Sequence, residues 1–426
     1  MQIHVIQPGE SIYTIARRYG VPAERIITDN ELAQPDRLAV GQTLVILFPE
    51  QVHTAEPGET LPSIAQRFGV PVRQLLRNNP ALYRSVRPGQ SVVLRYPAPP
   101  LGPLAVNGYA YPFINRDTLY KTLPFLTYLT LFGCHANADG SLKNMDDAEL
   151  IATARAYGTA PLMLISNLDC QDRFNSELAH RILNSPEARE RLVAQTYSRA
   201  LELGYAGIDV DFEYILEEDA EAYASLMREL SAKLNPAGLV VFTALAPKSS
   251  SDQKGVLYAG HDYASLGRAA NGVMIMTYEW GYSTGMPMAI APLDSVRRVM
   301  DYAVTQIEPA KLLMGIPNYG YDWTLPYIYG QSRAPSISNT AAVQLAVDRG
   351  AVIRYDPKAQ SPWFRYWDAS GREHEVWFED ARSITSKLVL AHSYPLQGVS
   401  YWNVMRYFPQ NWLVLNALFH IRSGID

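Results

Sequence analysis

The chain has 426 residues, of which 48% are hydrophobic and 19% are charged, and its formal net charge is −5. This length exceeds what one ordinary core holds, so more than one domain is expected, and the composition excludes an intrinsically disordered chain. The acidic balance argues against nucleic acid as a partner, because a phosphate backbone is bound by a basic surface.

The N-terminal residues and the cysteines bear on where the protein is made. The opening MQIHVIQPGES has no basic segment followed by a long apolar run, so we expect no signal peptide. No run approaches about 18 apolar residues, so we expect no membrane span. The two cysteines, Cys134 and Cys170, exclude a disulfide framework and are expected to be buried thiols in a protein made in the cytoplasm, with a redox pair as the alternative. We expect a monomer with neither a metal nor a cofactor.

The N-terminal part of the chain is an internal repeat. Two successive segments, 1–49 and 50–97, each contain a short strand, a Pro-Gly-Glu-Ser/Thr turn, two helices separated by Gly-Val-Pro, a Gly-Gln turn and a closing strand. The pattern predicts two β-α-α-β modules, in which Ser11 and Thr60 cap the first helices. The proline-rich YPAPPLGP that follows predicts a stiff linker, placed at 98–104, across which few contacts are expected.

The rest of the chain alternates apolar, β-rich runs with amphipathic helical stretches such as 187–203 and 217–234. This alternation predicts an α/β fold, a closed (β/α)₈ barrel over 105–426. An open doubly wound sheet is the alternative, but no Gly-rich phosphate loop follows the first strand. Residues 322–377 are too long for a simple crossover, and their alternating Tyr, Trp and Arg predict an antiparallel hairpin in a small α+β insertion. The predicted strands lie near 107–112, 125–132, 160–166, 206–212, 239–245, 272–278, 311–317 and 398–404.

The stretch YAGIDVDFEY (205–214) places Asp209, Asp211 and Glu213 at every second position. In a strand these side chains share a face, whereas in a helix Asp211 would point away from the other two. The β-branched residues between them favour the strand, so the acids are expected to face the barrel lumen, with Glu213 at its C-terminal mouth. An exposed strand edge with solvated acids is the alternative. Adjacent buried carboxylates cannot all ionise, so at least one pKa should be raised, as a general acid requires.

The segment GIDVDFE is similar to the strand-four motif Asp-x-x-Asp-x-Asp-x-Glu of family 18 glycoside hydrolases, the chitinase-like barrels. Asp209, Asp211 and Glu213 match this motif, but Ala206 stands at its first Asp position. The difference removes one member of the proton-sharing row and leaves the terminal pair intact.

Two further motifs carry the same resemblance, which extends over most of residues 104–426. MTYEWG resembles the family's strand-six Met-x-Tyr-Asp, with Glu279 in place of Asp, and SYWNV resembles its strand-eight Trp, here Trp402. By this resemblance we assign substrate contacts to Trp402, Glu279, Trp280 and Tyr321.

The family resemblance implies a retaining mechanism in which the substrate's own N-acetyl group is the nucleophile. Glu213 would then protonate the leaving oxygen and later activate water. Asp211 would orient the acetamido group and stabilise the oxazolinium ion, while Asp209 would hold and tune Asp211. Tyr278 would bind the acetamido oxygen, and Trp402 would form an apolar floor beneath the sugar. The alternative for these two aromatic residues is a place in the barrel core.

The N-terminal repeats resemble LysM modules, which bind N-acetylglucosamine-containing glycans. The likeness is carried by the Pro-Gly-Glu-Ser/Thr turns and by the later Gly-Gln turns. Most of these turn residues are expected to serve folding, so that binding comes largely from backbone groups of the loops. The residues assigned to the glycan-binding turns are Gly9, Glu10, Ser11, Gly58, Glu59 and Thr60.

Two such modules before a barrel of this type resemble the cortical-fragment-lytic N-acetylglucosaminidases of endospore-forming bacteria. The resemblance implies hydrolysis of spore-cortex peptidoglycan during germination, by a protein deposited in the spore coat or cortex region. A chitinase acting on chitin oligomers and a non-hydrolytic, lectin-like barrel are the alternatives. The presence of Glu213 argues against the lectin, because loss of that acid is the simplest way to disarm the site.

Overall fold

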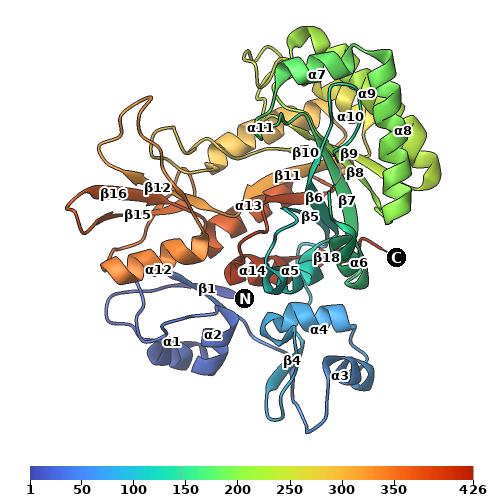
Figure 1. The fold of residues 1–426 in the computed structure, drawn as a ribbon. Helices are drawn as coiled ribbons and strands as arrows, with labels where there is room; N and C mark the ends of the chain where they lie inside the picture. The colour runs from blue at the N-terminus through green and yellow to red at the C-terminus, as the bar shows by residue number, and fades with distance from the viewer. Residues whose placement is uncertain (144, 426) are drawn as a thin grey trace.

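The computed structural model describes residues 1–143 and 145–425. Among them, eight parallel strands pair side by side, and the last, β17, pairs with the first, β5, so the sheet closes into a barrel (Figure 1). The predicted (β/α)₈ barrel is therefore confirmed, and the open-sheet alternative is wrong. Strands such as β7 are buried along their whole length, as expected for parallel strands covered on both faces. The strands are β5 (Pro103–Ala110), β6 (Tyr128–His135), β7 (Ala160–Ser166), β8 (Gly207–Asp211), β9 (Val240–Leu245), β10 (Gly272–Ile275), β11 (Leu312–Pro317) and β17 (Gly398–Trp402).

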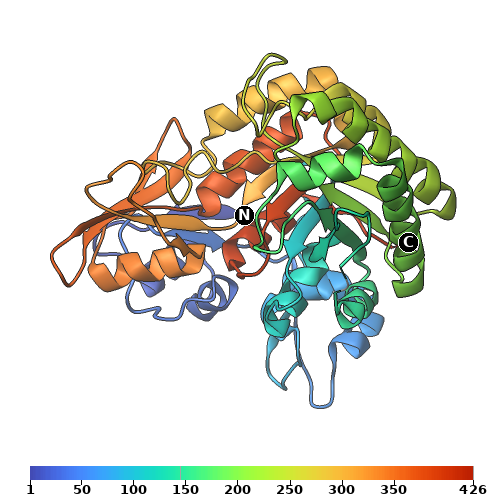
Figure 2. The ribbon, with the colours of Figure 1, turned by 45° about the horizontal axis from the view of Figure 1, so that its top comes forward.

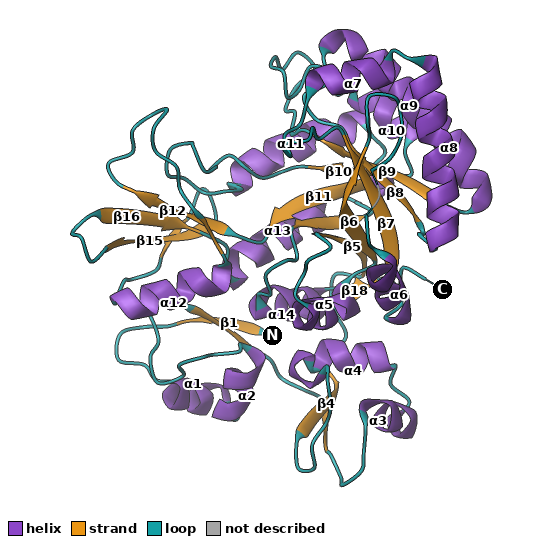
Figure 3. Ribbon diagram, in the orientation of Figure 1, coloured by secondary structure: helices purple, strands orange, loops and turns teal. Residues whose placement is uncertain are grey.

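Helices surround the barrel strands and begin and end at sequence signals (Figure 3). Helix α8 (Pro186–Leu203) follows the capping hydroxyl of Ser185 and ends at Gly204, which takes a left-handed φ of 78°. Helix α9 (Ala220–Leu234) was also predicted, although residues 217–219 form a 3₁₀ turn. No described helix is long and apolar enough to cross a membrane. The others in the barrel are α5 (Arg116–Thr122), α6 (Ala148–Ala156), α7 (Ser176–Leu183), α10 (Tyr263–Ala269), α11 (Leu293–Gln306), α13 (Ala381–Ser393) and α14 (Pro409–Leu418).

Between β11 and α13 the chain forms the predicted α+β insertion, which projects from one side of the barrel (Figure 2). Its antiparallel sheet has the order β13-β12-β16-β15-β14, and the predicted hairpin is the β15–β16 pair, in which Phe364 faces Val376. These side chains pack with Phe378 and with Ala342 and Ala346 of α12 into a separate small core. The elements are β12 (Gly320–Thr324), β13 (Ser336–Ile337), α12 (Asn339–Arg349), β14 (Arg354–Asp356), β15 (Ser361–Trp367) and β16 (Glu373–Trp377).

Both N-terminal modules have the predicted β-α-α-β order, and each is held together by the same hydrogen bonds. In the first module, Nε2 of His4 and the amide of Gln7 lie 2.8 and 2.9 Å from Oε2 of Glu10. Glu59 makes the equivalent contacts in the second module. The glutamate of each Pro-Gly-Glu turn thus ties the turn to the first strand. The elements are β1 (Gln2–Val5), α1 (Ile12–Tyr19), α2 (Ala23–Asp29), β2 (Thr43–Ile46), β3 (Gln51–Thr54), α3 (Leu61–Phe68), α4 (Val72–Asn78) and β4 (Ser91–Arg95).

The modules pack against the barrel, so the expectation that few contacts cross the linker is wrong. In the first module, Val45 and Leu47 are buried in the same core as the barrel. The side chain of Gln410 on α14 lies 2.7 Å from the hydroxyl of Thr43 and also binds its carbonyl. In the second module, Arg73 of α4 binds backbone carbonyls of the barrel. Apolar burial and buried hydrogen bonds therefore fix both modules on the barrel.

We expect Arg73→Ala to lower the free energy of unfolding by about 1–3 kcal/mol, because it removes partly buried hydrogen bonds from a charged donor to the barrel backbone. The guanidinium donates to Pro124 O at 3.0 Å, to Gly158 O at 2.7 Å and to Leu126 O. Urea unfolding of the full chain measures the loss. Glu24→Ala is the matched control, since Glu24 occupies the same place in the first repeat and is exposed. Equal stability of the two variants would contradict the anchoring role.

The two cysteines differ in burial. Cys134 on β6 is buried as expected, whereas Cys170 is exposed, and there the expectation is wrong. It lies in the loop after β7, which turns back through a bridge between Leu168 and Phe174. Such loop tips lie at the surface because their backbone groups need solvent.

Candidate active site

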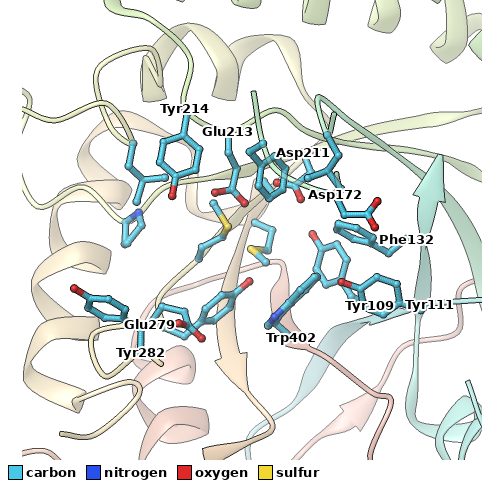
Figure 4. Close-up of a pocket in the computed structure, with 18 of the residues that line it drawn as sticks. Tyr109, Tyr111, Phe132, Asp172, Asp211, Glu213, Tyr214, Glu279, Tyr282 and Trp402 are labelled. Atoms are coloured by element: carbon cyan, nitrogen blue, oxygen red, sulfur yellow. The ribbon is translucent and has the colours of Figure 1, made fainter. Parts of the chain in front are cut away.

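A cavity of about 1000 Å³ opens at the C-terminal ends of the barrel strands. Aromatic side chains form much of its wall, and Asp172, Asp211, Glu213 and Glu279 are the acids that line it. Figure 4 shows Asp211 and Glu213 entering from one side and Trp402 lying across from them. Within the described parts of the chain, no cluster of three or more His, Cys, Asp or Glu side chains could hold a metal ion. An apolar cavity with a few convergent polar groups is typical of a small-molecule site.

Strand β8 directs its acids as the alternation predicts. Asp209 points into the lumen, where its Oδ2 accepts a 2.6 Å hydrogen bond from the hydroxyl of Tyr109 on β5. Phe212 points the other way and stacks on Tyr223 of α9, with ring centroids 5.8 Å apart. Glu213 lies just beyond the strand, at the cavity. The exposed-edge alternative is therefore wrong.

The three acids differ in burial along the strand. Asp209 is 0% exposed and lies beneath the cavity, whereas Asp211, at 5%, lines it. Glu213 is half-buried and is the most open of the three. Ala206, at the position of the first motif Asp, precedes β8 and is half-buried. The row of three acids thus forms without an acid at that position.

Burial and mutual repulsion raise the pKa of each acid. Burial raises the pKa of Asp209 to about 6. Burial, with the charges of Glu213 and Asp209, raises the pKa of Asp211 well above its usual range. Burial and the nearby Glu279 raise the pKa of Glu213 to about 7. Glu213 therefore retains a proton near neutral pH, which is the property that a general acid needs.

Two buried side chains hold the backbone that carries Glu213. The amide of Asn167 donates to the Glu213 carbonyl and accepts from its N–H, both at 2.9 Å. Nε2 of His261 donates to the Phe212 carbonyl at 2.9 Å, while Nδ1 accepts from Ala246 N at 3.0 Å. Burial lowers the pKa of His261 to about 4, which keeps this neutral arrangement. These bonds position the acid beyond the end of the β8 ladder. Sequence reasoning missed both residues, because neither belongs to a local pattern.

The segment after β10 forms another wall of the cavity. The strand ends at Ile275, earlier than predicted, because Thr277 N bonds back to Ile275 O in a tight turn. Tyr278 is 7% exposed and faces the cavity, as does Trp280. Both residues therefore lie where a substrate could contact them.

Two tyrosine hydroxyls hold the carboxylate of Glu279, which lines the same cavity as Asp211 and Glu213. Its backbone takes a left-handed φ of 66°. The hydroxyls of Tyr319 and Tyr321 donate to its Oε1, the latter at 3.1 Å. Tyr321, which we assigned to substrate contact, is not among the cavity residues and binds Glu279 instead. Tyr321 therefore contributes to the site indirectly, by binding a residue that lines the cavity.

We expect Glu279→Gln to move the alkaline limb of the kcat/KM profile to lower pH. Activity falls as pH rises through the pKa of Glu213, about 7, because the acid must be protonated. Removing the Glu279 charge removes a repulsion and lowers the pKa of Glu213. Glu218→Gln, which removes an exposed charge, is the control. A limb that stays in place or moves to higher pH would contradict this coupling.

Trp402, at the end of β17, lies among aromatic rings on one side of the cavity. Its ring centroid is 5.5 Å from that of Tyr109, 5.4 Å from that of Phe132 and 6.3 Å from that of Tyr111. These three neighbours were not among the residues predicted from the sequence. Tyr111 continues the alternation of Tyr109, which could have identified it. The other lining residues that were missed include Phe113, Asp172, Tyr214, Tyr258 and Tyr282.

The residues assigned to the LysM turns all stabilise those turns. The glycines take left-handed φ values of 80° and 85°, which other residues rarely adopt. The hydroxyl residues form capping boxes at α1 and α3. The glutamates bind turn amides and a neighbouring histidine. In chain order these residues are Gly9, Glu10, Ser11, Gly58, Glu59 and Thr60.

Comparison with known proteins agrees with this geometry. The sequence model of Glycosyl hydrolases family 18 matches residues 163–406, more than half of the chain. The LysM domain model matches residues 4–47 and 53–95. The chain belongs to glycosyl hydrolase family 18, and it is a glycosidase that carries LysM domains at its N-terminus.

Several relatives match almost the whole chain. It is 42% identical over 427 residues to the cortical fragment-lytic enzyme of Bacillus subtilis (strain 168), covering 99% of each chain. It is similar to the crystal structure of the Bacillus cereus spore cortex-lytic enzyme SleL, with a TM-score of 0.85 and 36% identity, over 100% of this chain and 99% of that one. A chitinase from Chromobacterium violaceum matches 74% of this chain and 98% of its own, with a TM-score of 0.69 and 25% identity.

Proposed function

We propose that this glycosidase is an N-acetylglucosaminidase that degrades spore-cortex peptidoglycan during germination. The observation that carries the proposal is the pair Asp211 and Glu213, which enter one aromatic cavity with raised pKa values. The full-length likeness to cortical fragment-lytic enzymes supports the choice of substrate. We further propose that the protein acts as a monomer, is made in the cytoplasm and is stored in the spore coat or cortex region.

In the first step Glu213 donates its proton to the glycosidic oxygen as the bond to C1 breaks. The carbonyl oxygen of the substrate's 2-acetamido group attacks C1 and forms an oxazolinium ion. Oδ1 of Asp211 is buried and has no hydrogen-bond partner among the described residues, so it can accept the acetamido N–H. Tyr278 binds the acetamido oxygen, and Trp402 packs under the ring. Asp209 supports Asp211 from below.

In the second step the ionised Glu213 removes a proton from water, which attacks C1 from the face that the leaving group vacated. The C1–oxygen bond of the oxazolinium breaks, and the acetamido group is restored. Two displacements at C1 retain the configuration. The clamp of Asn167 on the backbone of Glu213 keeps the carboxyl in reach for both proton transfers.

The LysM domains supply a second contact with the glycan. Because the assigned turn side chains stabilise their own turns, we place glycan recognition in the loop backbones. LysM domains that hold the polymer raise the local concentration of glycosidic bonds near the active-site cavity. The expected ligand is peptidoglycan or another N-acetylglucosamine-containing glycan, with neither a cofactor nor a metal required.

Digestion of purified cortex fragments tests the proposed function. The expected products carry N-acetylglucosamine at the new reducing end, and mass spectrometry after borohydride reduction identifies them. Chitin oligomers of equal length are the comparison, because the likeness to a chitinase makes chitin the competing substrate. Faster turnover of chitin than of cortex fragments would overturn the choice of peptidoglycan, and reducing-end muramic acid would overturn the bond assignment.

A further inference from the structure

The first LysM domain contains a groove, and one wall of this groove comes from another part of the chain. A cavity of about 350 Å³ lies between residues 10–13 and residues 35–38, and Val347 of α12 also lines it. Its size is at the lower end of the range of about 300–1,000 Å³ found for small-ligand sites. The blue first domain lies beside the orange insertion in both Figure 1 and Figure 2. One wall of the groove is thus supplied by the catalytic part of the chain.

The insertion is fixed against this groove by backbone contacts. The amide of Ile353 donates to the carbonyl of Val40 at 2.9 Å. A Cβ added at Gly41 would lie 1.8 Å from the carbonyl oxygen of Ile353, so only glycine permits this approach. Arg37 in the groove and Asp348 on α12 form an ion pair at 3.8 Å. The loop and the helix therefore keep one relative position.

The second LysM domain shows that this docking is not a property of the repeat. Gly89 occupies the position of Gly41 and has the same left-handed φ, 83° against 84°. A Cβ at Gly89 would meet no described residue within 4 Å. The corresponding loop there instead contacts the barrel through Arg84, which lies 2.6 Å from Asp117 Oδ2. The insertion thus completes the groove of the first domain specifically.

We propose that α12 and the first LysM domain together form one glycan-binding groove. Tyr13, 62% exposed, offers a ring face on one side, and Val347 offers an apolar contact on the other, as a sugar ring with an N-acetyl methyl group requires. Arg37 and backbone groups of residues 10–12 supply polar contacts at the edges. The inference rests on the glycan-binding role proposed above for the LysM domains.

The same insertion also reaches the catalytic cavity, because Tyr321 on β12 binds Glu279. A glycan in the groove is therefore held by the element that borders the cleft. The two sites share this packed element, so the groove fixes where the polymer lies and does not merely raise its concentration. Changes in the groove should alter retention on the polymer without altering turnover of short fragments.

Val347→Glu in the full chain tests the composite groove. We expect affinity for insoluble cortex peptidoglycan to fall about tenfold, because the acid replaces an apolar contact at the ring face. Ala341→Glu is the matched control, since Ala341 is exposed elsewhere on α12. Pelleting assays in the presence of a saturating thiazoline inhibitor measure retention with the cleft blocked. Turnover of short soluble fragments, expected to be unchanged in both variants, reports that the barrel is folded.

A second pair of variants probes the docking itself. Gly41→Ala and Gly89→Ala impose the same backbone strain, but only the first meets the Ile353 carbonyl. We expect retention on cortex peptidoglycan to fall more for Gly41→Ala than for Gly89→Ala.

If Tyr13→Ala weakens retention while Val347→Glu and Ala341→Glu behave alike, the domain binds glycan without α12 and the inference is overturned. If Tyr13→Ala has no effect, the groove is not the glycan site and the inference is again overturned. Failure of the wild-type chain to cleave soluble fragments would instead contradict the proposed function.

Discussion

Glu213→Gln should lower kcat on cortex fragments by about 10²- to 10⁴-fold and leave glycan binding close to that of the unaltered protein. The amide cannot release a proton to the glycosidic oxygen, nor can it take one from water in the second step. Asn167 binds the backbone of residue 213, which the substitution leaves unchanged, so the local geometry should persist. Reducing-end release measures turnover, and pelleting with cortex measures binding.

The leaving group gives this experiment a second readout. An aryl glycoside that releases 4-nitrophenolate needs little protonation, so Glu213→Gln should lose less activity on it than on a natural glycan. Glu218→Gln removes an exposed acid five residues along the chain and should behave like the unaltered protein. Turnover of natural glycan within tenfold of normal in Glu213→Gln would show that another group is the acid.

The barrel could be predicted because its strands are short buried runs separated by helices of adequate length. The acids of β8 and of the residues just beyond it were found for the same reason: Asp209, Asp211 and Glu213 alternate at a spacing that the sequence shows directly. Strand ends were less predictable. Beyond Ile275 the residues Thr277 and Tyr278 still favour a strand, so the pattern extends it, whereas hydrogen bonds in tight turns end the ladder there.

The aromatic walls of the site could not be predicted in the same way. Phe132 on β6 meets Trp402 on β17, and Tyr258 lines the same cavity as the acids, only in three dimensions. Asn167 and His261 act on backbone groups, which no motif records. For such residues the local sequence holds no periodic signal, since their partners are set by barrel closure.

The sequence does contain a signal of how the N-terminal domains dock on the barrel. The two repeats share their fold-determining turns but differ where they touch the barrel. Arg73 stands where the first repeat has Glu24, and buried Leu47 stands where the second has exposed Arg95. At these two positions the difference between the repeats coincides with a contact to the barrel, because residues outside the common core are free to differ.

Asp211→Asn should lower kcat by about 10²–10³-fold, because the amide cannot offset the positive charge that develops on the acetamido nitrogen. The carboxylate of Asp211 is buried, and its Oδ1 has no partner among the described residues, so it is poised to accept that N–H. In the alternative mechanism, Asp211 acts as a conventional nucleophile that attacks C1. Carboxyl groups about 5–5.5 Å apart are typical of that mechanism. In an extended chain, Cα atoms two residues apart lie about 7 Å from each other, a spacing that permits either role.

The substrate separates the two mechanisms. Only the substrate-assisted route needs the N-acetyl carbonyl, so a glycan with a free amine at C2 should be nearly inert. A thiazoline that mimics the oxazoline should inhibit competitively and protect the protein from thermal unfolding. A fluorosugar that traps covalent glycosyl-enzymes should leave no adduct, as intact-mass measurement of the treated protein would show. A stable adduct on Asp211 would make that residue the nucleophile and would leave Glu213 as the acid. Cleavage of the free-amine glycan at the normal rate would exclude participation of the acetamido group.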